Sequence, residues 1–175
     1  SQCDLVMLQE VGELDPSDQW VERVRNLADS TAIFAHNARE PDLSTKLQCG
    51  GVGIVATSEV RHRVIERGKD PSGLGRWAWM RMLGEEGHYV RFVSAHRPCS
   101  SGGSSSVFQQ HNRALANRTP RTAILEDLVS AMTEWKTHGD HLFLGMDANE
   151  DIRQGEVCTL LAEVGLREAM LDHHS

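Results

Sequence analysis

The sequence predicts a single α/β domain built from short buried strands and amphipathic helices. Apolar runs that end in Gly, Asp or Asn recur along the chain, which is typical of strands that enter tight turns. Other stretches repeat apolar residues at helical spacing after a capping residue and a proline. Because the chain has 175 residues, no internal repeat and no linker, residues 1–175 are expected to form one domain.

The composition excludes several classes of protein. A hydrophobic share of 39% and a charged share of 25% are typical of a globular domain and not of a disordered chain or a fibre. No apolar run approaches membrane-spanning length, so we expect no membrane partner. The net charge of -7 argues against a general nucleic-acid coat, whose affinity comes from Lys and Arg residues that neutralise phosphates.

Most of the basic residues are arginines, and they crowd the middle of the chain. Arginine is suited to bidentate phosphate contact, and divalent metals offset clustered carboxylates, so a nuclease would tolerate the acidic balance. The alternative is that these arginines cover solvated strand faces. They are Arg61, Arg63, Arg67, Arg76, Arg81, Arg91, Arg97, Arg113, Arg118 and Arg121.

The four cysteines, at positions 3, 49, 99 and 158, do not have the spacing of a metal knuckle. We therefore expect reduced thiols in an intracellular protein. The chain begins at Ser1, directly before a core strand, which suggests a piece of a longer protein.

The first part of the chain predicts three strands and one helix. Residues 4–10 form an apolar strand that ends in a carboxylate, and residues 16–29 carry a helical stripe. Residues 31–35 predict a short strand, and the polar residues 37–48 predict a loop near the site. Residues 50–56 predict a strand whose glycines mark close backbone packing, since the GxGxxG nucleotide-binding pattern is absent.

The middle of the chain predicts further strands. Residues 60–66 alternate apolar and polar side chains, which predicts an exposed strand paired with the strand before it. Residues 68–75 are rich in Gly and predict a turn. Residues 76–82 and 89–95 predict a hairpin joined through a Gly-Glu-Glu-Gly connection.

The last part predicts three helices and one strand. A Ser/Gly-rich loop over residues 100–106 precedes a helix over residues 108–117. A capping Thr119 followed by a proline opens the clearest helix of the chain. A buried strand then begins at His141, and residues 154–163 predict the last helix.

Polar groups stand at the ends of three predicted strands. Asp147 and Asn149 are two residues apart, so they can face the same way in an extended or turn segment. Glu10 ends the first strand, and we expect it to meet Asp147 at one sheet edge. The alternative for Asp147 and Asn149 is turn chemistry and a cap for the following helix. His96 and Arg97 end another strand, where they would polarise or clamp a phosphate; a structural side chain is the alternative for His96.

The order of these segments resembles a known superfamily. The segments are QE at 9–10, GGVGI at 50–54, HRP at 96–98 and GMDAN at 145–149. Together they resemble the endonuclease/exonuclease/phosphatase superfamily, most closely the apurinic-endonuclease-like domains of non-LTR retrotransposons. The resemblance covers nearly the whole chain, and it implies a four-layer α/β sandwich of two mainly antiparallel sheets flanked by helices.

The resemblance also implies roles for the strand-end residues. Glu10 matches the glutamate that binds Mg²⁺ or Mn²⁺, Asp147 the aspartate that orients or deprotonates the attacking water, and Asn149 the amide that holds the scissile phosphate. His96 stands where many members carry a Tyr that contacts phosphate, and Arg97 beside it is a candidate substrate contact. One glutamate is enough to anchor Mg²⁺, because this ion keeps several of its waters.

Two parts of the family pattern have no counterpart here. They are an N-terminal strand with an Asn and a C-terminal Ser-Asp-His segment with the catalytic His. The pair His173 and His174 follows Asp147 too soon to supply that segment. We therefore expect this chain, truncated at both termini, to be weakly active or inactive.

The function that follows is a Mg²⁺-dependent endonuclease that hydrolyses DNA phosphodiester bonds to nick a retroelement target site. It implies a DNA substrate, a longer polyprotein with a reverse transcriptase, and an intracellular location with the nucleus as a candidate. One alternative is a phosphatase for small phosphoesters such as inositol phosphates, which the acidic balance favours. Another is a catalytically dead scaffold that binds a partner or nucleic acid.

Overall fold

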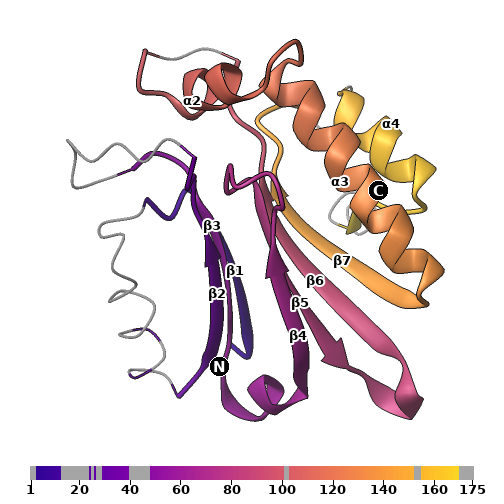
Figure 1. Cartoon of the computed structure of the whole chain (residues 1–175). Helices are drawn as coiled ribbons and strands as arrows, with labels where there is room; N and C mark the ends of the chain where they lie inside the picture. The colour runs from indigo at the N-terminus through magenta and orange to yellow at the C-terminus, as the bar shows by residue number, and fades with distance from the viewer. Residues whose placement is uncertain are drawn as a thin grey trace.

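The computed structural model describes residues 3–12, 24, 26, 29–39, 48–100, 103–151 and 155–169. In this part of the chain two β-sheets face each other, and helices cover the outer face of the larger sheet (Figure 1). The fold is the predicted α/β sandwich of two mainly antiparallel sheets flanked by helices. Its elements are, in chain order, β1 (Leu5–Gln9), β2 (Thr31–Ala35), β3 (Val52–Ala56), η1 (Ser58–Arg63), β4 (Val64–Lys69), β5 (Trp77–Leu83), η2 (Glu85–Gly87), β6 (Tyr89–His96), α2 (Val107–Ala114), α3 (Pro120–Thr137), β7 (Asp140–Asp147) and α4 (Glu156–Glu163).

The smaller sheet has the order β1-β3-β2, and both pairs are antiparallel. Gly53 lies in the central strand opposite Phe34. A Cβ atom at Gly53 would lie 2.4 Å from the ring of Phe34, so only glycine leaves room for that ring. Gly53 therefore confirms the predicted close packing at one of the glycines of residues 50–56.

The larger sheet has the order β4-β5-β6-β7. Strands β5 and β6 form the predicted antiparallel hairpin, with η2 in its connection. Strands β6 and β7 are parallel, and α2 and α3 lie in the crossover between them. Because these two strands run in the same direction, their carboxyl ends lie side by side, with His96 opposite Asp147.

The strand predicted over residues 60–66 is wrong in both its position and its partner. The chain instead turns through η1 and forms β4, which pairs with the following strand β5. The physical reason is that β3 is the central strand of its sheet, with both edges already occupied by β1 and β2. The turn predicted over residues 68–75 is also shorter, because β4 continues to Lys69.

Two apolar clusters stabilise this architecture. One fills the space between the sheets and includes Val52, Ile54 and Met80. The other packs α3 and α4 against the larger sheet and includes Ile124 and Leu128, both fully buried. Burying such side chains is the main favourable contribution to folding.

Three arginines contradict the expectation of solvated strand faces. Arg76, Arg91 and Arg97 are each less than 5% exposed. Arg76 pairs with Asp70 at 2.7 Å, and Arg91 pairs with a buried aspartate of β7, also at 2.7 Å. These buried arginines therefore form ion pairs within the protein, where an unpaired charge would lower stability.

The predicted α3 begins as expected, since the Thr119 hydroxyl accepts a hydrogen bond from the Thr122 amide and a proline follows. The helix predicted over residues 16–29 lies almost wholly outside the described residues, as do most of the loop over 37–48 and both C-terminal histidines. The four cysteines carry free thiols, as predicted. In the described part of the chain no helix has the length and apolar character needed to span a bilayer.

Candidate functional site

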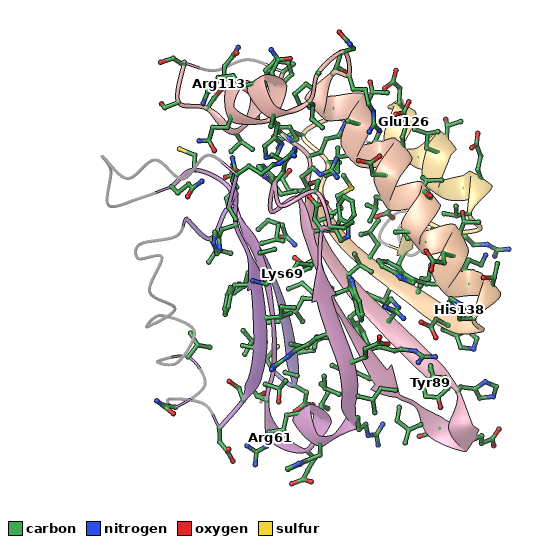
Figure 2. All side chains as sticks on the ribbon, in the orientation of Figure 1. Arg61, Lys69, Tyr89, Arg113, Glu126 and His138 are labelled. Atoms are coloured by element: carbon green, nitrogen blue, oxygen red, sulfur yellow. The ribbon has the colours of Figure 1, made fainter. Side chains whose placement is uncertain are left out.

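Three strands end at the same end of the sandwich, where α2 lies (Figure 1). Figure 2 shows Tyr89, at the start of β6, and His138, just before β7, at the end of the molecule away from Arg113 of α2. The carboxyl ends of β6 and β7 therefore lie on the side of Arg113. The site residues predicted from the sequence follow these strand ends.

His96 lies at the centre of the site and is 3% exposed. Its Nε2 atom is 3.4 Å from Oε1 of Glu10 and 3.4 Å from Nδ2 of Asn149. Burial lowers the pKa of His96, while the negative charges of Glu10 and Asp147 act in the opposite direction. The structure thus brings Glu10, His96, Asp147 and Asn149 together.

The expected meeting of Glu10 and Asp147 at one sheet edge is wrong in one respect. Glu10 follows β1 of the smaller sheet, whereas Asp147 ends β7 of the larger sheet, so the two acids belong to different sheets. Sequence patterns at strand ends do not distinguish strands of one sheet from strands of two packed sheets.

Gln9 fixes β1 against the larger sheet. Its side-chain amide donates to the Ser94 hydroxyl at 3.0 Å and to the Gly145 carbonyl at 3.3 Å. A Cβ atom at Gly145 would lie 2.8 Å from the side chain of Met7, so this glycine lets β1 approach β7 closely. The position of Glu10, the next residue, depends on these contacts.

Glu10 and Asn149 both adopt left-handed backbone conformations, with φ of 53° and 48°. Asn tolerates this region, but Glu adopts it rarely. Two backbone bonds hold the chain after Glu10, from Val11 N to Gly51 O at 3.2 Å and from Gly12 N to Gly50 O at 3.0 Å. Such conformations cost about 1–3 kcal/mol and are concentrated at functional sites.

The Asp147–Asn149 turn is held by its own polar groups. The Asn149 amide N–H donates to Oδ1 of Asp147 at 3.2 Å, which is the turn chemistry expected as an alternative. The Asn149 side chain donates to the Arg97 carbonyl at 2.8 Å and accepts from the Cys99 thiol at 2.9 Å. The cap of α4 comes instead from Glu150, whose Oε1 accepts from the Val157 amide at 2.8 Å.

Arg97 is turned away from the cluster of Glu10, His96 and Asp147. Its guanidinium forms an ion pair with Glu150, lies 3.4 Å from Glu156, and donates from Nε to the Arg121 carbonyl at 3.2 Å. Burial acts to raise the pKa of Glu150, but the Val157 hydrogen bond and the two arginines outweigh it and lower that pKa. A substrate contact by Arg97 stays a prediction.

Five residues of the site were not assigned a role from the sequence. They are Gln9, Ser94, Cys99, Arg121 and Glu150. Gln9 and Glu150 are sequence neighbours of predicted site residues, so their place near the site could have been predicted from the sequence. Arg121 was named only as one of ten arginines in the middle of the chain, and its position at the site depends on the first turn of α3.

The described residues include no group of three or more His, Cys, Asp or Glu side chains arranged to hold a metal ion. They therefore do not fit a closed zinc site, which needs four protein ligands. The Glu10 side chain is 62% exposed, and a Mg²⁺ or Mn²⁺ ion that keeps most of its waters would use it as its protein ligand.

The sequence matches no protein-family profile and no curated protein. Among solved structures, the catalytic domain of human Nocturnin is similar, with a TM-score of 0.59 and 16% sequence identity. The match covers 91% of this chain and 56% of that chain, so this chain spans little more than half of the Nocturnin domain. The likeness shows the fold alone: this chain shares the two-sheet α/β fold of that catalytic domain.

Proposed function

We propose that this chain is the core of a metal-dependent phosphodiesterase that nicks DNA. The observation that carries the proposal is the convergence of Glu10, His96, Asp147 and Asn149 at one end of the sandwich. These side chains supply a cation ligand, a neutral hydrogen-bonding ring, a carboxylate base and an amide donor. Phosphodiester hydrolysis uses these groups.

Asp147 is the proposed base. Its Oδ1 atom accepts from the Asn149 backbone, which fixes the carboxylate at the strand end. An ionised carboxylate accepts hydrogen bonds at both oxygens, so it can also orient an attacking water and take its proton. A base placed in this way contributes about 10²–10⁴ in rate.

Asn149 and His96 are the proposed phosphate ligands. The Asn149 side-chain amide has two N–H groups, and one donates to the Arg97 carbonyl. Nδ2 also lies 3.4 Å from Nε2 of His96, and we propose that its second N–H donates instead to a phosphate oxygen when substrate binds, without adding charge. Because burial lowers the pKa of His96, its ring is neutral at pH 7 and can donate one hydrogen bond beside the amide.

Glu10 is the proposed ligand of Mg²⁺ or Mn²⁺. Such an ion, when bound, stabilises the negative charge that develops on the phosphate. The human Nocturnin catalytic domain was solved with a bound sulfate anion, and sulfate has the tetrahedral shape of a phosphate. This likeness supports an oxyanion ligand for the fold.

The test is nicking of supercoiled plasmid by the protein expressed from the full reading frame that encodes this chain. We expect open-circle product with Mg²⁺ or Mn²⁺, and a loss of about 10²–10⁴ in rate for Asp147→Ala. Glu163→Gln, which removes an exposed carboxylate from α4, is the matched control and should keep the wild-type rate. Intact plasmid with both metals would contradict the proposal.

A small phosphoester is the second candidate substrate. The net charge is -7, and the structure pairs several arginines with acids, which leaves fewer positive charges for a long phosphate backbone. These paired residues are Arg76, Arg81, Arg91, Arg97, Arg118 and Arg121. Turnover of inositol phosphates measured beside plasmid nicking decides between the two substrates.

A scaffold without turnover is the third candidate. It needs no cation at Glu10, so calorimetry with Mg²⁺ separates it from both enzymes. The reverse transcriptase partner and the nuclear location rest on the sequence resemblance, and the flanking coding sequence tests the first of them directly.

A further inference from the structure

A polar cluster lies behind Asn149, on the side of α3 and α4. It consists of Arg97, which follows β6, Arg121 in the first turn of α3, and Glu150, which follows Asn149. In Figure 2, Glu126 of α3 lies at the same end of the molecule as Arg113 of α2, which places the start of α3 at the site end. The side chains of Arg97, Arg121 and Glu150 are all less than 20% exposed.

The Glu150 carboxylate joins the members of this cluster. Oε2 forms an ion pair with Arg97 and lies 3.4 Å from Nη2 of Arg121. Oε1 accepts from the Val157 amide in the first turn of α4. A Cβ atom at Gly155 would lie 1.9 Å from Oε1, so the chain is shaped around this carboxylate.

Arg97 and Arg121, which both contact Glu150, also form hydrogen bonds with Asn149. The Arg97 carbonyl accepts from the Asn149 side chain at 2.8 Å, and Arg121 donates from Nη2 to the Asn149 carbonyl at 3.2 Å. Arg121 also donates to the Pro98 carbonyl at 2.7 Å, which joins the segment after β6 to the turn after β7. Asn149 is therefore held at its backbone and at its side chain by residues that Glu150 fixes.

We propose that Glu150 is a positioning residue that holds the Asn149 amide in place through Arg97 and Arg121. In this arrangement Arg97 acts through its ion pair with Glu150 and its carbonyl contact with Asn149. The effect on turnover rests on the proposed function, whereas the effect on the geometry of Asn149 does not. A role limited to starting α4 is the alternative, because Glu150 also caps that helix.

The geometry has a reporter that does not depend on catalysis. The exposed Cys99 thiol donates to Oδ1 of Asn149 at 2.9 Å, so its reaction with a disulfide reagent follows the position of the Asn149 side chain. Cys3, Cys49 and Cys158 are first replaced by Ser in the full protein, which leaves one reporter thiol among the described residues. Asn149→Ala then gives the rate of the released thiol.

Glu150→Gln is the informative variant, because glutamine keeps an oxygen for the Val157 amide while losing the charge that pairs with the arginines. We expect its Cys99 rate to rise about tenfold toward that of Asn149→Ala, the size expected for one lost charge-assisted bond. Glu156→Gln is the matched control. It removes a carboxylate that lies 3.4 Å from the same Arg97 but is 74% exposed, so its rate should change less than about twofold.

Turnover supplies the second readout. If Glu150 acts through Asn149, Glu150→Gln alone should lower kcat. In the double variant with Asn149→Ala, Glu150→Gln should add little to the loss of kcat that Asn149→Ala already causes. An unchanged Cys99 rate in Glu150→Gln, or independent losses in the double variant, would overturn the positioning role. If the wild type has no turnover while the thiol rates behave as expected, the proposed function fails and the positioning role stands.

Discussion

Nε2 of His96 lies 3.4 Å from Oε1 of Glu10, although the two residues come from strands of different sheets. The contact joins the end of the larger sheet to the segment after β1 at the proposed site. His96 is buried, whereas the Glu10 carboxylate is largely exposed. The buried ring therefore contacts the exposed carboxylate that is proposed to bind a cation.

The protonation state of His96 predicts a pH dependence of activity. Burial lowers the pKa of this ring below 6.5, so the ring is neutral at pH 7 and becomes charged only as the pH falls further. We expect kcat/KM for nicking to fall on the acid side below about pH 6.5. His96→Gln should lower kcat/KM at pH 7 and remove the acid-side fall that His96 causes. The same acid-side profile in the variant would show that another group titrates.

His111 predicts a pH dependence of stability. Burial, followed by the nearby Arg76 charge, lowers the pKa of its ring to about 4. The unfolded chain binds this proton below about pH 6.5 and the folded protein only near pH 4, so acid favours unfolding in that window. His111 should account for about 3 kcal/mol of the free energy of unfolding lost between these pH values.

His111→Gln is the variant that isolates this contribution. Its free energy of unfolding, measured with urea, should depend less on pH between about 6.5 and 4 than that of the wild type. The free energy of unfolding of His111→Gln should still fall with pH below pH 4. The reason is Asp70: burial acts to raise its pKa, but its Arg76 partner outweighs burial and lowers it. Equal slopes for the two proteins between pH 6.5 and 4 would rule out His111 as the cause.

Gly53 predicts a packing defect. A Cβ atom there would lie 2.4 Å from the Phe34 ring, so Gly53→Ala must displace an aromatic side chain in the smaller sheet. We expect a loss of about 1–3 kcal/mol in the free energy of unfolding. Gly103→Ala is the control, since a Cβ atom at that position would have no neighbour within 4 Å. Equal stability of the two variants would contradict the described packing.

The sequence was sufficient for the features that depend on local pattern. The β5-β6 hairpin, the Thr119 cap and the polar strand ends at His96 and Asp147 all follow from residue spacing and turn chemistry. The two-sheet α/β sandwich was expected from the resemblance that the order of four short segments carries. The hairpin, the helix cap and the polar strand ends are each encoded in a short stretch of the chain.

Features that depend on long-range contacts could not be predicted in this way. Residues 60–66 alternate like a strand that pairs with β3. Both edges of β3 are occupied by β1 and β2, however, so the chain forms η1 and then β4 of the larger sheet. Arg97 follows a strand end, where a phosphate ligand is expected, but its buried guanidinium forms an ion pair with Glu150. In both cases the deciding partner lies far away along the chain, where no local pattern reports it.

We propose that Glu10 binds a divalent cation next to His96, Asp147 and Asn149. Titration with Mn²⁺ tests this site, because the bound paramagnetic ion broadens the NMR signals of nearby nuclei. We predict that substoichiometric Mn²⁺ broadens the backbone amide signals of His96 and of the turn from Asp147 to Asn149, and that Glu10→Gln prevents this. Broadening confined to another part of the molecule, or unchanged broadening in Glu10→Gln, would show that no cation binds at Glu10.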